Sequence, residues 1–229
     1  MSAKPLSALG IALLCAPVII TAFINGWYLP AMAAWGLHWF WAVDMLQWVF
    51  LPLGLVIVLE RRDLPPSAYG FAKPSGHPAH FVLATVLVAL TLAAVYFGIR
   101  PWALKVFGPA PAGFQFENVE LTGLAGRVLW LYAGFTAGFV ESVFYIGLPW
   151  LACQRWRAGP DKQAPAWLTP TVFTLFSSLL FASVHWEQGY SGMVAAFAFG
   201  LAACLWFFRL GSLWQIALAH TLIDLYTFY

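Results

Sequence analysis

Seven apolar segments, each about as long as a bilayer-crossing helix, constrain this 229-residue chain more than any other feature. The hydrocarbon core of a membrane is about 30 Å thick and takes about 20 helical residues, and a chain inside it must satisfy its backbone hydrogen bonds internally. The segments cover residues 6–24, 34–59, 79–99, 125–151, 167–186, 190–209 and 212–228. The sequence therefore predicts an all-α protein, a polytopic bundle of about seven transmembrane helices.

The composition agrees with this fold class and limits the partners. Hydrophobic residues make up 62% of the chain and charged residues 9%, whereas about 25% of the residues in an average soluble domain are charged. The formal net charge of +2 is too small to suggest nucleic acid as a partner. We therefore predict that residues 1–229 form a single integral membrane domain in contact with the lipid bilayer. The sequence leaves the oligomeric state open.

The basic residues between the segments predict how the chain is oriented. Cytoplasmic loops of membrane proteins carry an excess of Lys and Arg. If the N-terminus is inside, the cytoplasmic basic residues are Lys4, Arg61, Arg62, Lys73, Arg155, Arg157, Lys162 and Arg209, and those outside are Arg100, Lys105 and Arg127. We therefore expect a multi-pass protein of the cell (inner or plasma) membrane with a cytoplasmic N-terminus.

A few ionisable residues lie inside the apolar segments and are the first candidates for chemistry. Each is costly at the bilayer centre and by default faces a protein interior or a water-filled cavity. They are Asp44 in the second segment, Glu141 in the fourth, His185 at the end of the fifth, and His220 with Asp224 in the seventh. We expect Asp44 to be a hydrogen-bonded packing residue, because no motif surrounds it.

The remaining residues, Glu141, His185, His220 and Asp224, come from three segments and are called the four site residues below. His220 and Asp224 are four positions apart, so both point from one helix face. A glutamate can deprotonate water, a histidine can orient that water or carry its proton, and further donors can stabilise an oxyanion. These residue types suit hydrolysis. They also suit zinc, but the chain has no HExxH pair, and spacing alone leaves a metal undecided.

Three motifs around these residues resemble those of a known family. The motifs read ESVFYIG from Glu141, FASVH from Phe181 and HTLID from His220. They are similar to the Glu-Glu-x-x-x-Arg-Gly, Phe-x-x-x-His and His-x-x-x-Asn/Asp motifs of the CPBP family of intramembrane proteases, which includes type II CAAX prenyl endopeptidases and bacteriocin-processing, Abi-like proteins. The likeness covers roughly residues 60–229, and residues 121–229 contain the core motifs.

The resemblance implies an intramembrane endopeptidase of the glutamic type. Glu141 would be the general base that activates water, assisted by His185. His220 and Asp224 would hold the scissile carbonyl and stabilise the tetrahedral intermediate. The better-understood family members are thought to work without a metal, so we expect no cofactor, with zinc as the less favoured alternative. We expect the substrate, a membrane-associated protein or peptide, to contact Ser142, Tyr145 and Phe181.

Two positions depart from the family pattern. Ser142 stands where the family has its second glutamate, and Ile146 where it has arginine. A buried arginine without its acidic partner would be costly, so the second replacement could follow from the first. Three classes of function stay open. The first is an endopeptidase that processes a C-terminal tail or sorting signal of an exported or membrane-anchored protein. The others are an inactive immunity or scaffold protein of the same family and a small proton-coupled transporter.

Overall fold

The computed structural model describes residues 8–24, 37–74, 76–110, 123–157 and 168–227. Within these ranges the chain forms helices joined by turns, with no strand. The helices are α1 (Ala8–Phe23), α3 (Leu37–Met45), α4 (Leu51–Glu60), α5 (Pro78–Phe107), α6 (Gly123–Phe135), α7 (Leu148–Arg157), α8 (Leu168–Ser183), α9 (Gly189–Leu210) and α10 (Trp214–Thr227). Residues 1–7 and 158–167, which contain the basic residues Lys4 and Lys162, lie outside the described ranges.

The predicted membrane bundle is confirmed. Among the described residues, four helices are long and apolar enough to cross a membrane: Trp41–Glu60, Pro78–Phe107, Gly123–Arg155 and Gly189–Leu210. Thr169–Ser183 is a shorter apolar helix. Each predicted segment coincides with one helix or with a run of joined helices. Large apolar side chains also cover the outside, and Leu90, Leu205 and Leu222 are each more than half exposed.

Wide helical turns join some helices into longer rods. The π-helical turn η2 (Leu46–Phe50) links α3 to α4, while η5 (Thr136–Val140) and η6 (Val143–Gly147) link α6 to α7. Single π-turns of this kind are frequent at functional sites. Glu141 lies between η5 and η6, so a widened turn precedes and follows the predicted general base.

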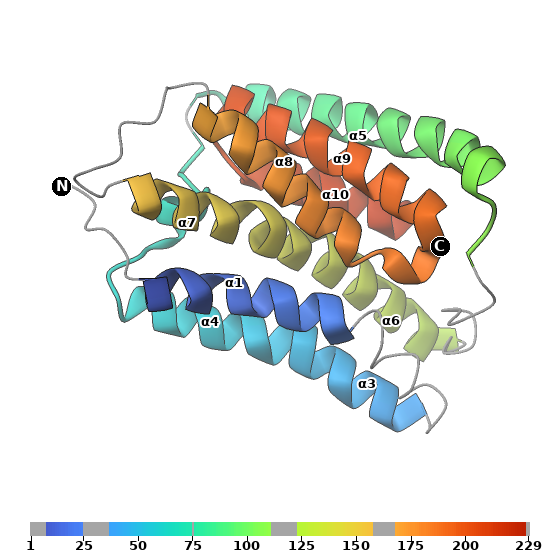
Figure 1. Cartoon of the computed structure of the whole chain (residues 1–229), viewed down its shortest axis with the longest axis horizontal. Coiled ribbons are helices and arrows are strands. Elements are labelled where there is room, and N and C mark those ends of the chain that lie inside the picture. Colours follow the sequence, from blue (N-terminus) through green and yellow to red (C-terminus); the bar gives the residue numbers. More distant parts are fainter. Residues whose placement is uncertain (1–7, 25–36, 75, 111–122, 158–167, 228–229) are drawn as a thin grey trace.

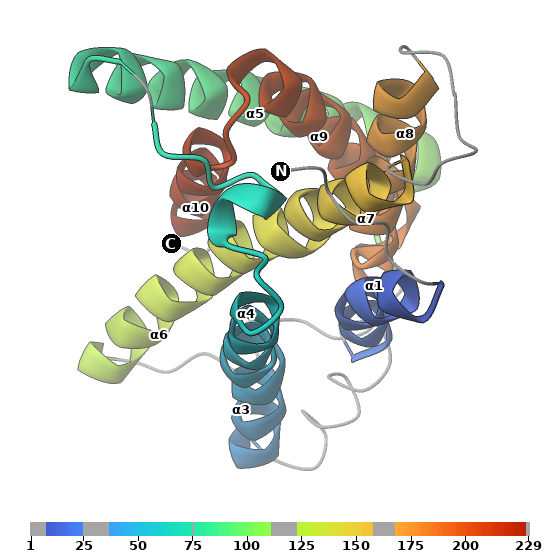
Figure 2. The same cartoon turned by 90° about the vertical axis from the view of Figure 1, so that its left-hand side faces the viewer.

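The rod formed by α6 and α7 crosses the middle of the molecule. The helices α5, α8, α9 and α10 lie on one side of it, and α1, α3 and α4 lie on the other (Figures 1 and 2). Glu141 belongs to this rod, between η5 and η6, and is buried.

The end of the third segment differs from the prediction. The segment is predicted to end at residue 99, because Pro101 is a helix breaker. Helix α5 instead continues to Phe107 with Pro101 inside it, and it stops at Gly108, whose φ is 77°. A proline in a helix removes one backbone hydrogen bond, and membrane helices tolerate this where neighbouring groups satisfy the freed carbonyl. The helix therefore ends at Gly108, whose positive φ a glycine adopts without steric cost.

Candidate active site

The four site residues line one cavity of about 80 Å³. A cavity needs about 10–15 Å³ to hold one water molecule, so this one is large enough for a hydrolytic water. The other residues that line it are Tyr96, Ala137, Phe181, Gln188, Ala196, Phe199, Ile223 and Thr227. The chemistry-bearing side chains thus come from the α6–α7 rod, from the turn after α8 and from α10.

Glu141 and His220 face each other across two helices. Glu141 is 6% exposed, and its Oε2 lies 3.9 Å from Nε2 of His220. The same Nε2 atom lies 3.5 Å from Oδ2 of Asp224, one turn further along α10. Nε2 of His220 therefore faces two carboxyl groups from different parts of the chain.

His185 lies in the turn after α8, with its ring fixed by its own backbone. Its Nδ1 is 2.8 Å from the carbonyl oxygen of Phe181. A carbonyl only accepts hydrogen bonds, so Nδ1 is the donor, and in the neutral ring Nε2 has a free lone pair. The ring of Phe181 lies 4.7 Å from that of His185 and 5.6 Å from that of His220. Phe181 thus packs against both histidines, and it lines the cavity as expected of a substrate contact.

The other two expected substrate contacts occupy a different place. Ser142 and Tyr145 line a smaller cavity of about 10 Å³, next to the first and also lined by Ile146. The Tyr145 hydroxyl forms a 2.8 Å hydrogen bond with the hydroxyl of Thr21 on α1, and its carbonyl oxygen accepts a hydrogen bond from Ser177. Tyr145 therefore links α1 and α8 to the central rod, and its hydroxyl does not point into the larger cavity.

Two glycines let α10 approach the central rod closely. A Cβ atom on Gly138 would lie 2.3 Å from the backbone nitrogen of Thr221, and one on Gly134 would lie 2.6 Å from a side-chain carbon of Leu225. Small residues four positions apart allow membrane helices to pack backbone against backbone. Gly138 precedes Glu141 by less than one turn, and Thr221 follows His220. This contact therefore sets the distance between the two site residues.

Asp44 lies away from this cavity. It is buried, and its Oδ2 accepts a 2.7 Å hydrogen bond from the hydroxyl of Tyr132 on α6. This is the environment expected of a hydrogen-bonded packing residue.

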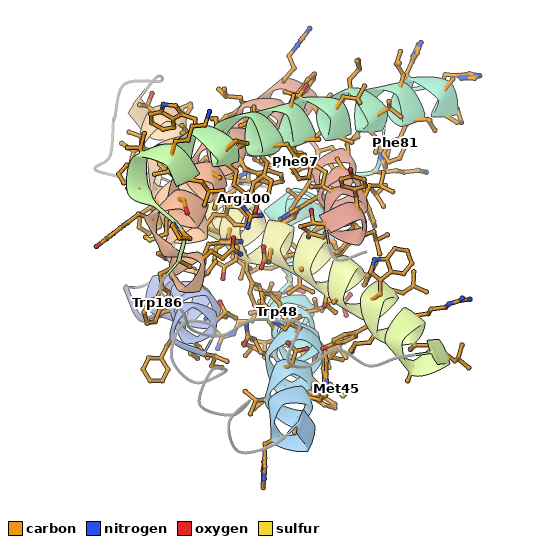
Figure 3. All side chains as sticks on the ribbon, turned by 90° about the vertical axis from the view of Figure 1, so that its right-hand side faces the viewer. Met45, Trp48, Phe81, Phe97, Arg100 and Trp186 are labelled. Carbon is orange, nitrogen blue, oxygen red and sulfur yellow. The ribbon has the colours of Figure 1, made fainter. Side chains whose placement is uncertain are left out.

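Several residues of the cavity wall were not found from the sequence. The ring of Phe199 lies 4.6 Å from that of His220, and Tyr96 accepts a 3.0 Å hydrogen bond from Arg100. Phe97 and Arg100 lie on the side of α5 that faces the other helices (Figure 3). The Tyr96–Arg100 pair, four positions apart at the end of an apolar segment, was a usable signal, whereas Phe199 looks like any other apolar residue of its helix.

No set of metal ligands is present in the described part of the chain. Within it, no group of three or more His, Cys, Asp or Glu side chains is arranged to hold a metal ion. A zinc site in a protein takes at least three such ligands.

The comparison with protein families finds a match to the part of the chain that contains the site. The model of the type II CAAX prenyl endopeptidase Rce1-like family matches residues 124–226, a range that contains all three motifs. Through these residues the chain is similar to this family. The resemblance derived from the three motifs is thereby confirmed. No curated protein and no solved structure matches the chain. The Rce1-like family is a protease family, so this match supports a membrane protease that acts on peptides.

Proposed function

We propose that this Rce1-like protein is an intramembrane endopeptidase that hydrolyses a peptide bond with water activated by Glu141. The observation that carries the proposal is the gathering of the four site residues, from three separate parts of the chain, around one cavity. Titratable groups that converge in a cavity large enough for water are the elements that hydrolysis needs. We also propose that the chain forms one membrane domain, with the chemistry in residues 121–229.

Glu141 serves as the general base in this proposal. Its carboxylate takes a proton from water as the water oxygen bonds to the scissile carbonyl carbon. Nε2 of His185, which has a free lone pair, accepts a hydrogen bond from the same water and orients it. The proton taken from water is delivered to the amine nitrogen as the C–N bond breaks. A positioned acid–base group of this kind contributes about 10²–10⁴-fold to the rate.

His220 and Asp224 hold the scissile carbonyl on the other side of the cavity. Negative charge develops on the carbonyl oxygen in the tetrahedral intermediate, and only donors can stabilise it. At least one of these two side chains must therefore present a proton to the oxygen. Their separation of 3.5 Å allows them to share one.

The metal-free mechanism is part of the proposal. Glu141 can activate water directly, since it lines the same cavity as the two histidines. We propose no cofactor, and this is tested by the chelator experiment in the Discussion.

The substrate we propose is a membrane-associated or exported protein that is cut near a C-terminal tail or sorting signal. The cavity lies toward the end of the bundle where α5 ends and the C-terminus lies (Figure 1), because Gln188 and Thr227 contribute to its wall. With the N-terminus in the cytoplasm, this end faces outward. We therefore place the enzyme in the cell membrane with its site opening toward the outer half of the bilayer.

Comparing protein termini in membranes tests the activity without a known substrate. Membranes from cells that express the wild type or the Glu141→Gln variant are analysed by mass spectrometry of protein N- and C-termini. We expect a small set of termini that only the wild type produces. Identical sets, at equal amounts of folded protein, contradict the proposal.

A second candidate is a binding protein of the same family without proteolysis. Ser142 and Ile146, in place of the family's glutamate and arginine, favour it. It predicts that Glu141→Gln leaves the cellular phenotype of the wild type intact and that no wild-type-specific termini are found.

A further inference from the structure

Ser142 has one hydroxyl hydrogen and two neighbours that can interact with it. Its Oγ lies 2.7 Å from the carbonyl oxygen of Gly138 and 3.4 Å from Nδ1 of His220. The carbonyl oxygen only accepts, so the hydroxyl hydrogen is donated to Gly138. With its hydrogen used in this way, Oγ can only accept from the imidazole. Nδ1 of His220 must therefore carry a hydrogen.

The opposite nitrogen of His220 faces the carboxyl groups. A neutral imidazole has one N–H, so a ring with hydrogen on Nδ1 has a bare lone pair on Nε2. Nε2 is the atom that lies 3.5 Å from Asp224 and 3.9 Å from Glu141. In the neutral ring it can accept a proton from this side of the cavity but cannot donate one.

Close packing fixes the positions of Ser142, Gly138 and the His220 ring relative to one another. Ser142 is 2% exposed and His220 is 6% exposed. Gly138, which accepts the hydroxyl hydrogen, is also the residue against which the backbone of Thr221 packs. The rings of Phe181 and Phe199 flank the imidazole at 5.6 and 4.6 Å, which hinders the ring rotation that would exchange its two nitrogens.

We infer that Ser142 is a positioning residue that holds His220 in the Nδ1–H form, so that Nε2 enters the site as a proton acceptor. The tautomer follows from the contacts alone, whereas its catalytic consequence rests on the proposed function. His220 then stabilises the oxyanion from Nε2 only after it has gained a proton there. That proton comes from the attacking water by way of Glu141. It leaves with the amine when the C–N bond breaks, so His220 returns to its neutral form.

Nitrogen NMR of the ring tests the inference directly. The full chain is labelled with ¹⁵N-histidine and placed in lipid nanodiscs at about pH 8, above the ordinary histidine pKa of about 6.5. The chain has five histidines, and the His220→Gln spectrum identifies the signals of His220. We expect a protonated Nδ1 and an unprotonated Nε2 in the wild type. A neutral His220 with hydrogen on Nε2 overturns the inference.

Variants of Ser142 distinguish the effect of its hydroxyl group from the effect of its side-chain size. Ser142→Ala leaves Nδ1–H without its acceptor, and we expect the Nε2–H form to become the major one. Ser142→Thr keeps the hydroxyl and should keep the wild-type tautomer. Ser178→Ala is the matched control, since Ser178 is also buried and donates to the carbonyl of the residue four positions earlier, at 2.7 Å. An unchanged tautomer in Ser142→Ala overturns the inference.

Kinetics on a substrate found by the comparison of termini test the catalytic part. We expect Ser142→Ala to lower kcat about tenfold, the order of one lost hydrogen bond, with KM unchanged and with recovery in Ser142→Thr. A raised KM at unchanged kcat would instead make Ser142 a substrate contact and overturn the positioning role. Absence of cleavage by every form, the wild type included, contradicts the proposed function and leaves the NMR result standing.

Discussion

Oδ2 of Asp224 lies 3.5 Å from Nε2 of His220, one turn earlier on α10. Within the described residues this buried oxygen makes no hydrogen bond. A carboxyl oxygen in this position can receive a proton from the imidazole or present one to a carbonyl oxygen in the cavity. The pair is therefore arranged to move a single proton between histidine, carboxylate and substrate.

Replacing Asp224 tests whether a hydrogen-bond donor at this position contributes to kcat. Asp224→Asn keeps a hydrogen-bond donor, whereas Asp224→Ala removes it. Loss of one oxyanion donor costs about 10²–10³ in kcat. We therefore expect kcat of Asp224→Ala to fall by about 10²–10³. The kcat of Asp224→Asn should stay within about tenfold of the wild type. Equal activity of the two variants, measured on the same substrate, would refute the role.

The glycine contact between the central rod and α10 gives a stability prediction. In Gly138→Ala the new Cβ would lie 2.3 Å from the backbone of Thr221, so α10 must shift. Overpacking of this kind costs about 1–3 kcal/mol, and we expect a lower Tm together with loss of activity. Gly98→Ala on α5 is the control, because nothing lies within 4 Å of its added Cβ. A Gly138→Ala variant as stable and active as Gly98→Ala would contradict the close contact.

The hydrogen bond between Thr21 and Tyr145 predicts coupled stability effects. Thr21→Val and Tyr145→Phe should each cost about 0.5–1.5 kcal/mol of unfolding free energy. The double variant should cost clearly less than the sum of the two, because both single changes break the same 2.8 Å bond. The kcat/KM of Tyr145→Phe should stay near the wild-type value. Additive costs, or a raised KM in Tyr145→Phe, would instead support a direct substrate contact.

Removal of metal tests whether the proposed hydrolysis proceeds without a metal ion. We expect peptide hydrolysis to persist after dialysis against a strong chelator and elemental analysis of the active protein to find zinc well below one equivalent. The reason is that Glu141 activates water directly. Loss of activity on chelation, with recovery on addition of zinc, would replace this mechanism with a metal-dependent one.

The sequence predicted the helices and the site residues for identifiable reasons. The apolar segments stand out because a membrane helix needs a continuous run of about 20 apolar residues. The four site residues stand out because ionisable groups are rare in such runs. The pairing of His220 with Asp224 follows from their spacing, since residues four apart share a helix face.

Other features depend on contacts that spacing cannot show. Thr21 and Tyr145 are far apart in the sequence and meet only after the helices pack. Phe199 on α9 packs against His220 on α10, with ring centroids 4.6 Å apart, and nothing in the spacing of the two residues indicates this contact. The π-turns around Glu141 leave no mark in the hydrophobic pattern. The Pro101 prediction was wrong because the local helix-breaking rule did not include the neighbours of α5.

The central claim, that Glu141 activates water, is tested most directly by the kcat of the purified Glu141→Gln variant. The assay uses a substrate found from the wild-type-specific termini, with Glu60→Gln as control, since Glu60 is an exposed glutamate at the end of α4. We predict that Glu141→Gln keeps the wild-type Tm and KM but loses at least about 10²–10⁴-fold in kcat, while Glu60→Gln matches the wild type. A folded Glu141→Gln variant that retains wild-type kcat would contradict the claim.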